Sequence, residues 1–271
     1  MGAGCALISA CLFPSVGELT GGTDAAIESA ADTSVEASSD GGFDGGTCGD
    51  GSSLFRDKLC KTPTTFCEDF DHDQVFGAWQ TTPTSQGGNV VYDPSVSASP
   101  PRSAKCTTPG SSINEQVYAG LQRDFAGAAR VVLDFDVRIE QPTSSAETGL
   151  FQFTLYPTPP YDYATAAVDI LQTFSVKQTT HLLDGGYMGN DTTFTDAAVP
   201  FGAWHHVQLD MDFAGKTAKL AIDGQPVSTT ALNNGFMPGS KATLTIGQYY
   251  AYGPTPPLTI HIDDVVVDST P

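Results

Sequence analysis

Apolar and polar side chains alternate with a period of two through much of this chain, and this alternation constrains the fold more than any other feature. Residues 131–140 read VVLDFDVRIE, so every second side chain is apolar and those between are mostly charged. Similar runs occupy residues 150–156, 168–177, 204–213, 217–222 and 260–267. A period of two places the apolar side chains on one face of a strand. The pattern therefore predicts a set of half-buried β-strands.

The segments between these runs carry turn residues. The chain has 28 glycines and 18 prolines, and Asp223-Gly224 is a strong signal for a tight hairpin turn. Residues 214–216, Ala-Gly-Lys, form a second short turn candidate. Many short antiparallel strands with no convincing helical period predict an all-β domain. We expect one antiparallel β-sandwich of the jelly-roll type over residues 59–271.

Residues 12–58 have a different composition. They consist mainly of Gly, Ser, Ala, Thr, Asp and Glu, and the first 55 residues hold eight acidic and no basic side chains. Such a segment cannot bury enough apolar surface to offset the entropy lost on ordering. We predict a disordered, acidic linker that extends by self-repulsion. The net charge of −19 also argues against nucleic-acid partners.

Residues 1–11 are short, small and apolar, and they end in Ile8-Ser9-Ala10-Cys11. This ending resembles the lipobox of bacterial lipoproteins. The resemblance implies that Cys11 is acylated after cleavage before it, and that a lipid anchor holds an exported protein in the bacterial cell envelope, in the outer membrane or at the cell surface. No Lys or Arg precedes Arg56, so we expect the natural start to lie upstream. The alternative is a buried apolar segment with two core cysteines.

The remaining four cysteines suit an oxidising compartment. Cys48, Cys60, Cys67 and Cys106 form an even set, which predicts two disulfides with three conceivable pairings. We favour Cys67 with Cys106, because both lie in strand-like runs, and this leaves Cys48 with Cys60. Zinc binding is disfavoured because the chain has no C-x-x-C pair.

Several motifs together resemble a known superfamily. They are Trp204-His-His-Val207, Ile222-Asp-Gly224, Ile262-Asp-Asp-Val265, Phe66-Cys-Glu-Asp-Phe70 and Ser99-Pro-Pro-Arg-Ser103. Over residues 64–270 they resemble the concanavalin A-like lectin/glucanase superfamily, in particular its laminin-G-like members. The resemblance implies a concanavalin A-like jelly roll and assigns no catalytic residue.

For function, the resemblance favours a non-catalytic surface module that binds carbohydrate or protein. One alternative is a glycan-cleaving enzyme of the same fold, and another is a passive structural protein of the envelope. Glucan-cleaving members resemble one another in a Glu-x-Asp-x-x-Glu strand. The nearest counterpart is Asp134, Asp136 and Glu140, whose spacing and residue types depart from that pattern. A solvated strand face therefore explains these acids better than catalysis.

Jelly-roll polysaccharide lyases offer a second enzymatic alternative. They use a His or Tyr as base beside Arg, Lys, Asn or Gln side chains that neutralise the sugar carboxylate. The chain has five histidines, but no lyase motif accompanies them: His72, His181, His205, His206 and His261. No G-x-S-x-G sequence indicates a serine hydrolase either.

Aromatic side chains can stack on sugar rings. This makes five residues candidate contacts for a polysaccharide or glycoprotein: Trp79, Tyr187, Tyr249, Tyr250 and Tyr252. We expect no cofactor and no dedicated metal site. Calcium is the one alternative, because two pairs of acids offer hard oxygen ligands: Asp210 with Asp212, and Asp263 with Asp264.

Overall fold

The computed structural model describes residues 65–71, 76–85, 87–110, 116–140, 148–170, 173–198, 201–251 and 254–270. For residues 187–198 it describes the backbone only. The predicted anchor at Cys11, the linker and the predicted disulfide between Cys48 and Cys60 lie outside these residues. The domain boundaries predicted at residues 11 and 58 do so as well. Within the described part of the chain, no helix is long and apolar enough to cross a membrane.

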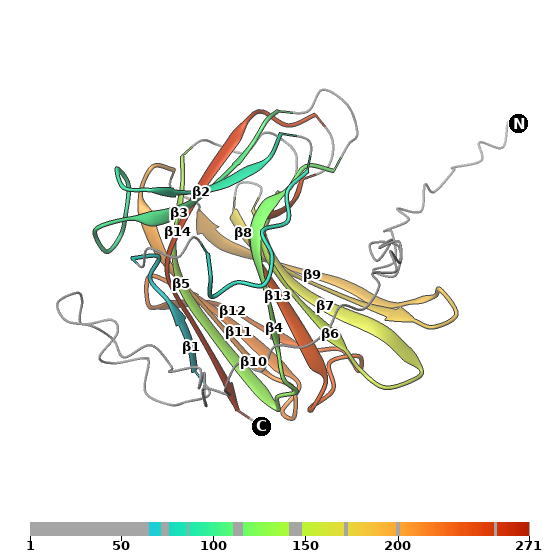
Figure 1. Ribbon diagram of the computed structural model, residues 1–271. Coiled ribbons are helices and arrows are strands. Elements are labelled where there is room, and N and C mark those ends of the chain that lie inside the picture. Colours follow the sequence, from blue (N-terminus) through green and yellow to red (C-terminus); the bar gives the residue numbers. More distant parts are fainter. Residues whose placement is uncertain are drawn as a thin grey trace, which may run out of the picture. The chain divides into compact units, whose positions relative to one another are not determined.

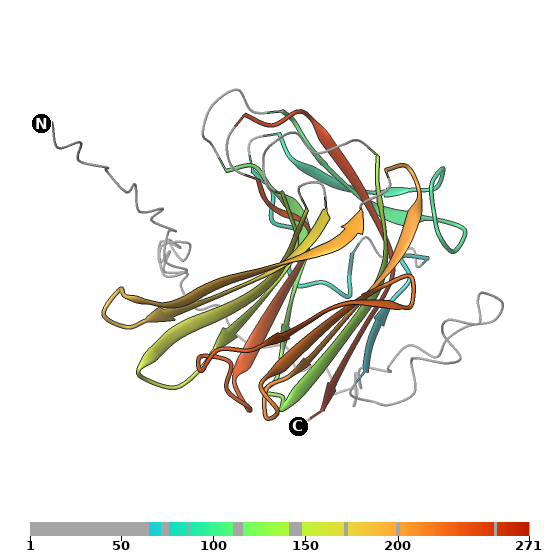
Figure 2. The same cartoon turned by 180° about the vertical axis from the view of Figure 1, so that it is seen from behind.

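Two antiparallel sheets make up the domain (Figures 1 and 2). The eight-stranded sheet has the order β12 (Gln225–Ala231), β11 (Thr217–Ile222), β10 (Trp204–Asp212), β5 (Arg130–Ile139), β14 (Leu258–Thr270), β3 (Ser103–Thr108) and β2 (Asn89–Asp93), and β1 (Thr65–Glu68) also pairs with β14. The six-stranded sheet has the order β4 (Ala119–Phe125), β13 (Lys241–Ala251), β6 (Thr148–Tyr156), β7 (Tyr161–Ile170), β8 (Thr173–Leu182) and β9 (Tyr187–Ala198).

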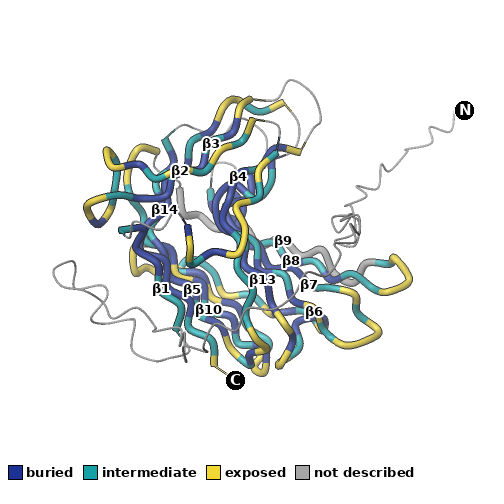
Figure 3. The backbone as a smooth tube through the Cα atoms, viewed as in Figure 1, coloured by how far each residue is buried: buried dark blue, intermediate teal, exposed yellow. Residues whose placement is uncertain are grey.

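The inner faces of the two sheets form one hydrophobic core (Figure 3). Phe135 on β5 meets Phe151 on β6 edge to face, with ring centroids 5.5 Å apart. Both rings are fully buried, as are Leu209 on β10 and Leu244 on β13. Burying one such side chain contributes about 1.5–3 kcal/mol. The predicted all-β sandwich is therefore confirmed.

The period-two segments became the central strands. The run at 131–140 is β5, with its odd-numbered apolar side chains in the core. The run at 204–213 forms β10, which pairs with β5 along its whole length. Asp223 and Gly224 have φ values of +52° and +74°. Positive φ at both central residues is what a type I′ hairpin turn requires, which explains the Asp-Gly pair between β11 and β12.

β14 contains an irregularity that the alternation does not predict. Its register with β5 shifts between Asp263 and Val266, and Asp264 has a φ of +50°. Asp263 is fully buried, and its carboxylate accepts hydrogen bonds from the backbone N–H groups of Ala98 and Ser99 at 2.9 and 3.0 Å. The irregularity is a β-bulge whose acid holds the loop between β2 and β3.

The predicted disulfide between Cys67 and Cys106 does not form. Cys106 is a free, buried thiol, and burial raises its pKa to about 12. The two residues pair with Val266 and Ile260 of β14, six positions apart and on opposite faces of the sheet. Such positions are too distant for a disulfide bond. Cys67 is disulfide-bonded, and its partner lies outside the described residues.

Candidate functional site

Each sheet has an outer face, turned away from the other sheet. On the eight-stranded sheet, pairing brings Trp204, Arg138, His261 and Lys105 into one row across β10, β5, β14 and β3. The candidate acids Asp134 and Asp136 lie on this same face, because they alternate with core residues of β5. Glu140 follows the end of β5 and belongs to a different cluster.

Asp134 and Asp136 are both held by one histidine. The ring of His206, on β10, lies 3.0 Å from Asp136 through Nδ1 and 3.4 Å from Asp134 through Nε2. The amide of Gln208 donates a further hydrogen bond of 2.7 Å to Asp134. The hydrogen bonds from His206 to Asp134 and Asp136 raise the pKa of His206 to about 10. At neutral pH His206 is therefore an imidazolium ion that bridges the two carboxylates and links β10 to β5. We call this arrangement the His206 clamp.

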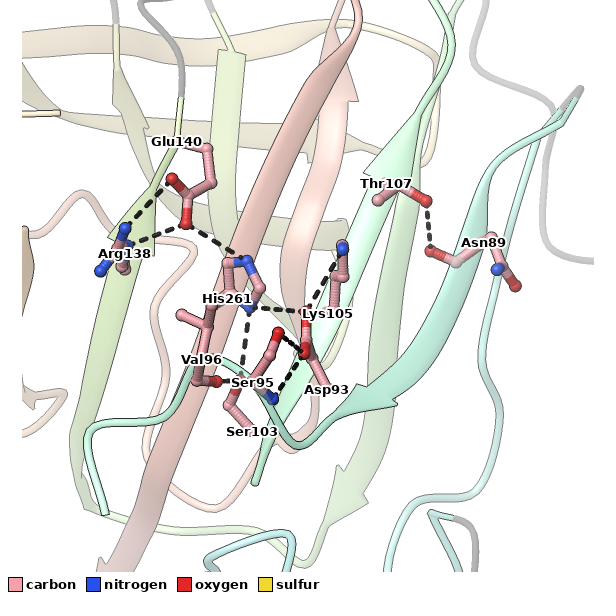
Figure 4. Close-up of polar contacts among 10 residues, drawn as sticks. All are labelled: Asn89, Asp93, Ser95, Val96, Ser103, Lys105, Thr107, Arg138, Glu140 and His261. Carbon is pink, nitrogen blue, oxygen red and sulfur yellow. Dashed lines mark hydrogen bonds and ion pairs between the residues drawn. The ribbon is translucent and has the colours of Figure 1, made fainter. Parts of the chain in front are cut away.

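Glu140 belongs to a polar cluster around His261 (Figure 4). Glu140 pairs with Arg138 at 2.8 Å and lies 3.4 Å from Nε2 of His261, whose Nδ1 is 3.4 Å from the hydroxyl of Ser103. This order of serine, histidine and acid resembles a hydrolase triad in composition only. Ser103 is fully buried and donates its hydroxyl to the carbonyl of Val96 at 2.6 Å. It cannot serve as an accessible nucleophile.

Two further ion pairs involve side chains of this face. Lys105 lies 3.2 Å from Asp93, and Arg130 makes two 2.8 Å hydrogen bonds to Asp210. Of the calcium candidates, Asp210 is thus occupied by Arg130, and Asp212 accepts the N–H of Gly215 at 2.7 Å. The described residues contain no cluster of three or more histidine, cysteine or acidic side chains suited to a metal ion.

The second pair of calcium candidates is buried. Burial, together with the neighbouring charge of Asp264, raises the pKa of Asp263 to about 8. Burial also raises the pKa of Asp264 to about 6, and its carboxylate accepts the hydroxyl of Ser99 at 2.9 Å. These acids have a structural role, because their hydrogen bonds hold the loop between β2 and β3 in place.

The outer face of the six-stranded sheet has a different character. Pairing aligns one polar row across five strands, which we call the central row: Gln122, Thr245, Gln152, Ala167 and Lys177. The neighbouring row, which we call the threonine row, contains Asp124, Thr243, Thr154, Thr165 and Thr179. Most of these side chains are neutral hydrogen-bonding groups. Among the described residues, no hydrogen bond joins the half-buried amide of Gln152 to another group.

One candidate aromatic residue belongs to this face. Tyr249, on β13, donates its hydroxyl to the buried carboxylate of Asp169 on β7 at 2.8 Å. Its ring crosses β6 at Gly149, where a Cβ atom would meet the ring at 2.1 Å. A glycine is therefore required at position 149 for Tyr249 to reach Asp169. The tyrosine and the acid flank the central row on the side opposite the threonine row.

The remaining aromatic candidates have different positions. Trp79 is a core residue, 6% exposed, whose ring stacks on Phe70 at 6.4 Å, so little of its side chain reaches the surface. Tyr250 is half-buried next to Tyr249, with ring centroids 6.2 Å apart. The side chains of Tyr187 and Tyr252 lie outside the described residues. Sequence analysis missed Gln152, Asp169 and Lys177, although alternation within each strand could have placed them on one face.

A jelly-roll sandwich with polar outer faces is the class of protein that this geometry defines. A model of the family described as the concanavalin A-like lectin/glucanases superfamily matches residues 165–270. Over these residues the chain resembles that superfamily, in agreement with the resemblance that the motifs indicated. No curated protein sequence matches the chain.

Solved structures agree on the fold. An endo-β-1,4-glucuronan lyase from the fungus Trichoderma reesei superposes with a TM-score of 0.59 at 17% identity, covering 76% of this chain and 95% of the lyase. The alginate lyase Aly36B gives a TM-score of 0.50 at 13% identity, covering 77% of this chain and 98% of that chain. A sialidase gives a TM-score of 0.52 at 12% identity, covering 76% of this chain and 18% of that chain.

The His206 clamp predicts a pH dependence of stability. The pKa of His206 is raised from 6.5 to about 10 in the folded chain. Its contribution is therefore complete below pH 6.5 and is lost as the pH rises through about 10. We expect the free energy of unfolding to fall over this range by about 1 kcal/mol more in the wild type than in His206→Gln, since partial exposure screens the pairs. Urea unfolding across this range measures the difference. His205→Gln is the matched control, and equal profiles for His206→Gln and wild type would contradict the clamp.

Proposed function

We propose that the domain binds a polysaccharide on the outer face of the six-stranded sheet. The central row carries the proposal, because it presents amides, hydroxyls and the ammonium group of Lys177 on one surface. Sugar hydroxyls are recognised by such neutral donors and acceptors, while an aromatic ring such as Tyr249 can cover the apolar face of a sugar. On the eight-stranded sheet, the charged groups described above are paired with one another, which leaves them less able to bind a ligand.

An acidic polysaccharide fits this face best. Lys177 supplies a positive charge within the central row. An ammonium group and an amide can both contact a sugar carboxylate. The two lyases with similar folds have names that refer to glucuronan and alginate, which supports testing these polymers first.

Cleavage of the same polymer by β-elimination is a second candidate function. It is favoured by the hydrogen bond between Tyr249 and Asp169, on the face that also holds Gln152. In such a reaction, a base removes the proton next to the sugar carboxylate and a carbon–carbon double bond forms. The glycosidic oxygen leaves with its bonding electrons and takes up a proton from water. Tyr249 is suited to act as the base, with Asp169 as acceptor of the phenol proton and Gln152 beside the sugar carboxylate.

We also propose that Cys11 anchors the chain by lipid at the bacterial cell envelope. The proposal is supported by the lipobox-like sequence at residues 8–11 and by the acidic composition of residues 12–58. An extended linker of that kind would hold the binding domain away from the membrane.

The binding proposal predicts the effect of two substitutions. Lys177→Met and Gln152→Ala should each weaken binding of β-1,4-glucuronan by about tenfold, because each removes a direct polar contact. Isothermal titration calorimetry measures the affinity, and the loss for Lys177→Met should shrink at high salt. Arg130→Met, on the outer face of the other sheet, is the matched control. Wild-type affinity in both variants would refute the assignment of this face.

The elimination candidate predicts an unsaturated product. If the wild-type chain releases ultraviolet-absorbing ends from glucuronan or alginate, Tyr249→Phe should lower that rate by at least about 100-fold, because the base is lost. Binding of the polymer should persist in this variant. Undiminished release by Tyr249→Phe would rule out Tyr249 as the base.

The anchor predicts a change of location. Cys11→Ser should move the chain from the membrane fraction of the producing bacterium to a soluble fraction, because no acyl chain can then be attached. Mass spectrometry of the purified membrane form should show an acylated Cys11. An unmodified Cys11 in membrane-bound chain would overturn the proposal.

A further inference from the structure

Two rings stack at the far end of the same face. Tyr163 on β7 and His181 on β8 are directly paired across the two strands, and their rings lie nearly parallel, 3.9 Å apart with an interplanar angle of 19°. Both side chains are half-buried. Their strand neighbours Ala164 and Thr180 are fully buried and point to the core. The Tyr163–His181 pair therefore lies on the outer face and plays no part in the core.

The pair is aligned with the proposed binding face. The threonine row and the central row lie between it and Asp169, and Tyr163 is six residues from Asp169 along β7. Six residues of strand span about 20 Å. A polysaccharide chain of several sugars would be needed to contact both Tyr249 and the ring pair at once.

The surface between these two ends carries mostly small side chains among the described residues. On β7 and β8 it is formed by small side chains at Thr165, Ala167, Ser175 and Thr179, and the first three are at most 9% exposed although they point away from the core. Lys177 is the one long outward side chain described on these two strands between the ring pair and Asp169. Among the described residues of β7 and β8, a bound linear glycan would therefore meet mainly small side chains.

The charge state of the ring pair is compatible with stacking on a sugar ring. Burial lowers the pKa of His181, against the opposing effect of Asp162, so the imidazole is uncharged at neutral pH. An uncharged tyrosine–imidazole stack presents an apolar surface fixed in orientation. Apolar ring faces pack on the C–H faces of sugars.

We propose that Tyr163 and His181 form a distal stacking subsite for one sugar of an acidic polysaccharide, so that the domain selects long chains over short ones. This inference rests on the proposed polysaccharide-binding function and adds a second contact point and a length preference to it.

The test is a titration with β-1,4-glucuronan oligosaccharides from disaccharide to octasaccharide. Wild-type affinity should rise with length until the oligosaccharide reaches the ring pair. Tyr163→Ala and His181→Ala should each weaken binding of the longest oligosaccharides by about fivefold to tenfold and leave the short ones unchanged. Tyr163→Phe should keep wild-type affinity, because stacking does not need the hydroxyl.

Trp204→Ala, on the outer face of the other sheet, is the matched aromatic control and should bind all lengths like the wild type. Thermal unfolding checks that each variant is folded, and Tyr163→Phe with His181→Ala keep the test valid should Tyr163→Ala not fold. Long-chain binding by the wild type that Tyr163→Ala and His181→Ala leave unchanged overturns the subsite alone. Absence of wild-type binding at every length overturns the proposed function and the subsite together.

Discussion

Packing between the inner faces of two antiparallel sheets is the constraint on which the rest of this domain depends. Rings such as Phe135 and Phe151 meet between the layers, and the alternation that places them there sends their strand neighbours outward. The composition of both outer faces is therefore determined by the strands that build the core. The two faces differ in the extent to which their outward side chains form ion pairs with one another.

The two outer faces differ in how their polar side chains are paired. On the eight-stranded sheet, His206 pairs with both Asp134 and Asp136, and Arg138 pairs with Glu140. The His206 pairs join β10 to β5, and the Arg138–Glu140 pair lies at one end of β5. On the six-stranded sheet, neutral amides and hydroxyls predominate, and the hydroxyl of Tyr249 on β13 donates to the buried carboxylate of Asp169 on β7. Neutral groups of this kind can form hydrogen bonds with sugar hydroxyls.

Much of the fold could be predicted from local sequence, because strand periodicity and turn chemistry are local properties. The run at 131–140 and the Asp223-Gly224 turn are examples. The direction of Cys106 could not be predicted, because the short run around it, SAKCTT, gives no clear apolar face. Trp79 lies outside any periodic run, so its burial against Phe70 depends on tertiary packing.

The candidate site was harder to predict than the fold. Gln152, Ala167 and Lys177 become neighbours only through the order of β6, β7 and β8 in the sheet, and their residue types look ordinary in isolation. Asp134 and Asp136 are catalytic candidates by sequence, because alternate carboxylates resemble a catalytic strand. In the structure, His206 binds both. Sequence spacing indicates which side chains share a strand face. It does not indicate which neighbouring groups already form hydrogen bonds or ion pairs with them.

The central claim is that the outer face of the six-stranded sheet, and not that of the eight-stranded sheet, holds the polysaccharide. Nuclear magnetic resonance of the labelled chain during titration with a glucuronan oligosaccharide tests it most directly. We expect the side-chain amide of Gln152 and the backbone signals of β6, β7 and β8 to shift, while those of His206 and Gln208 stay in place. Shifts confined to β5 and β10 would contradict it.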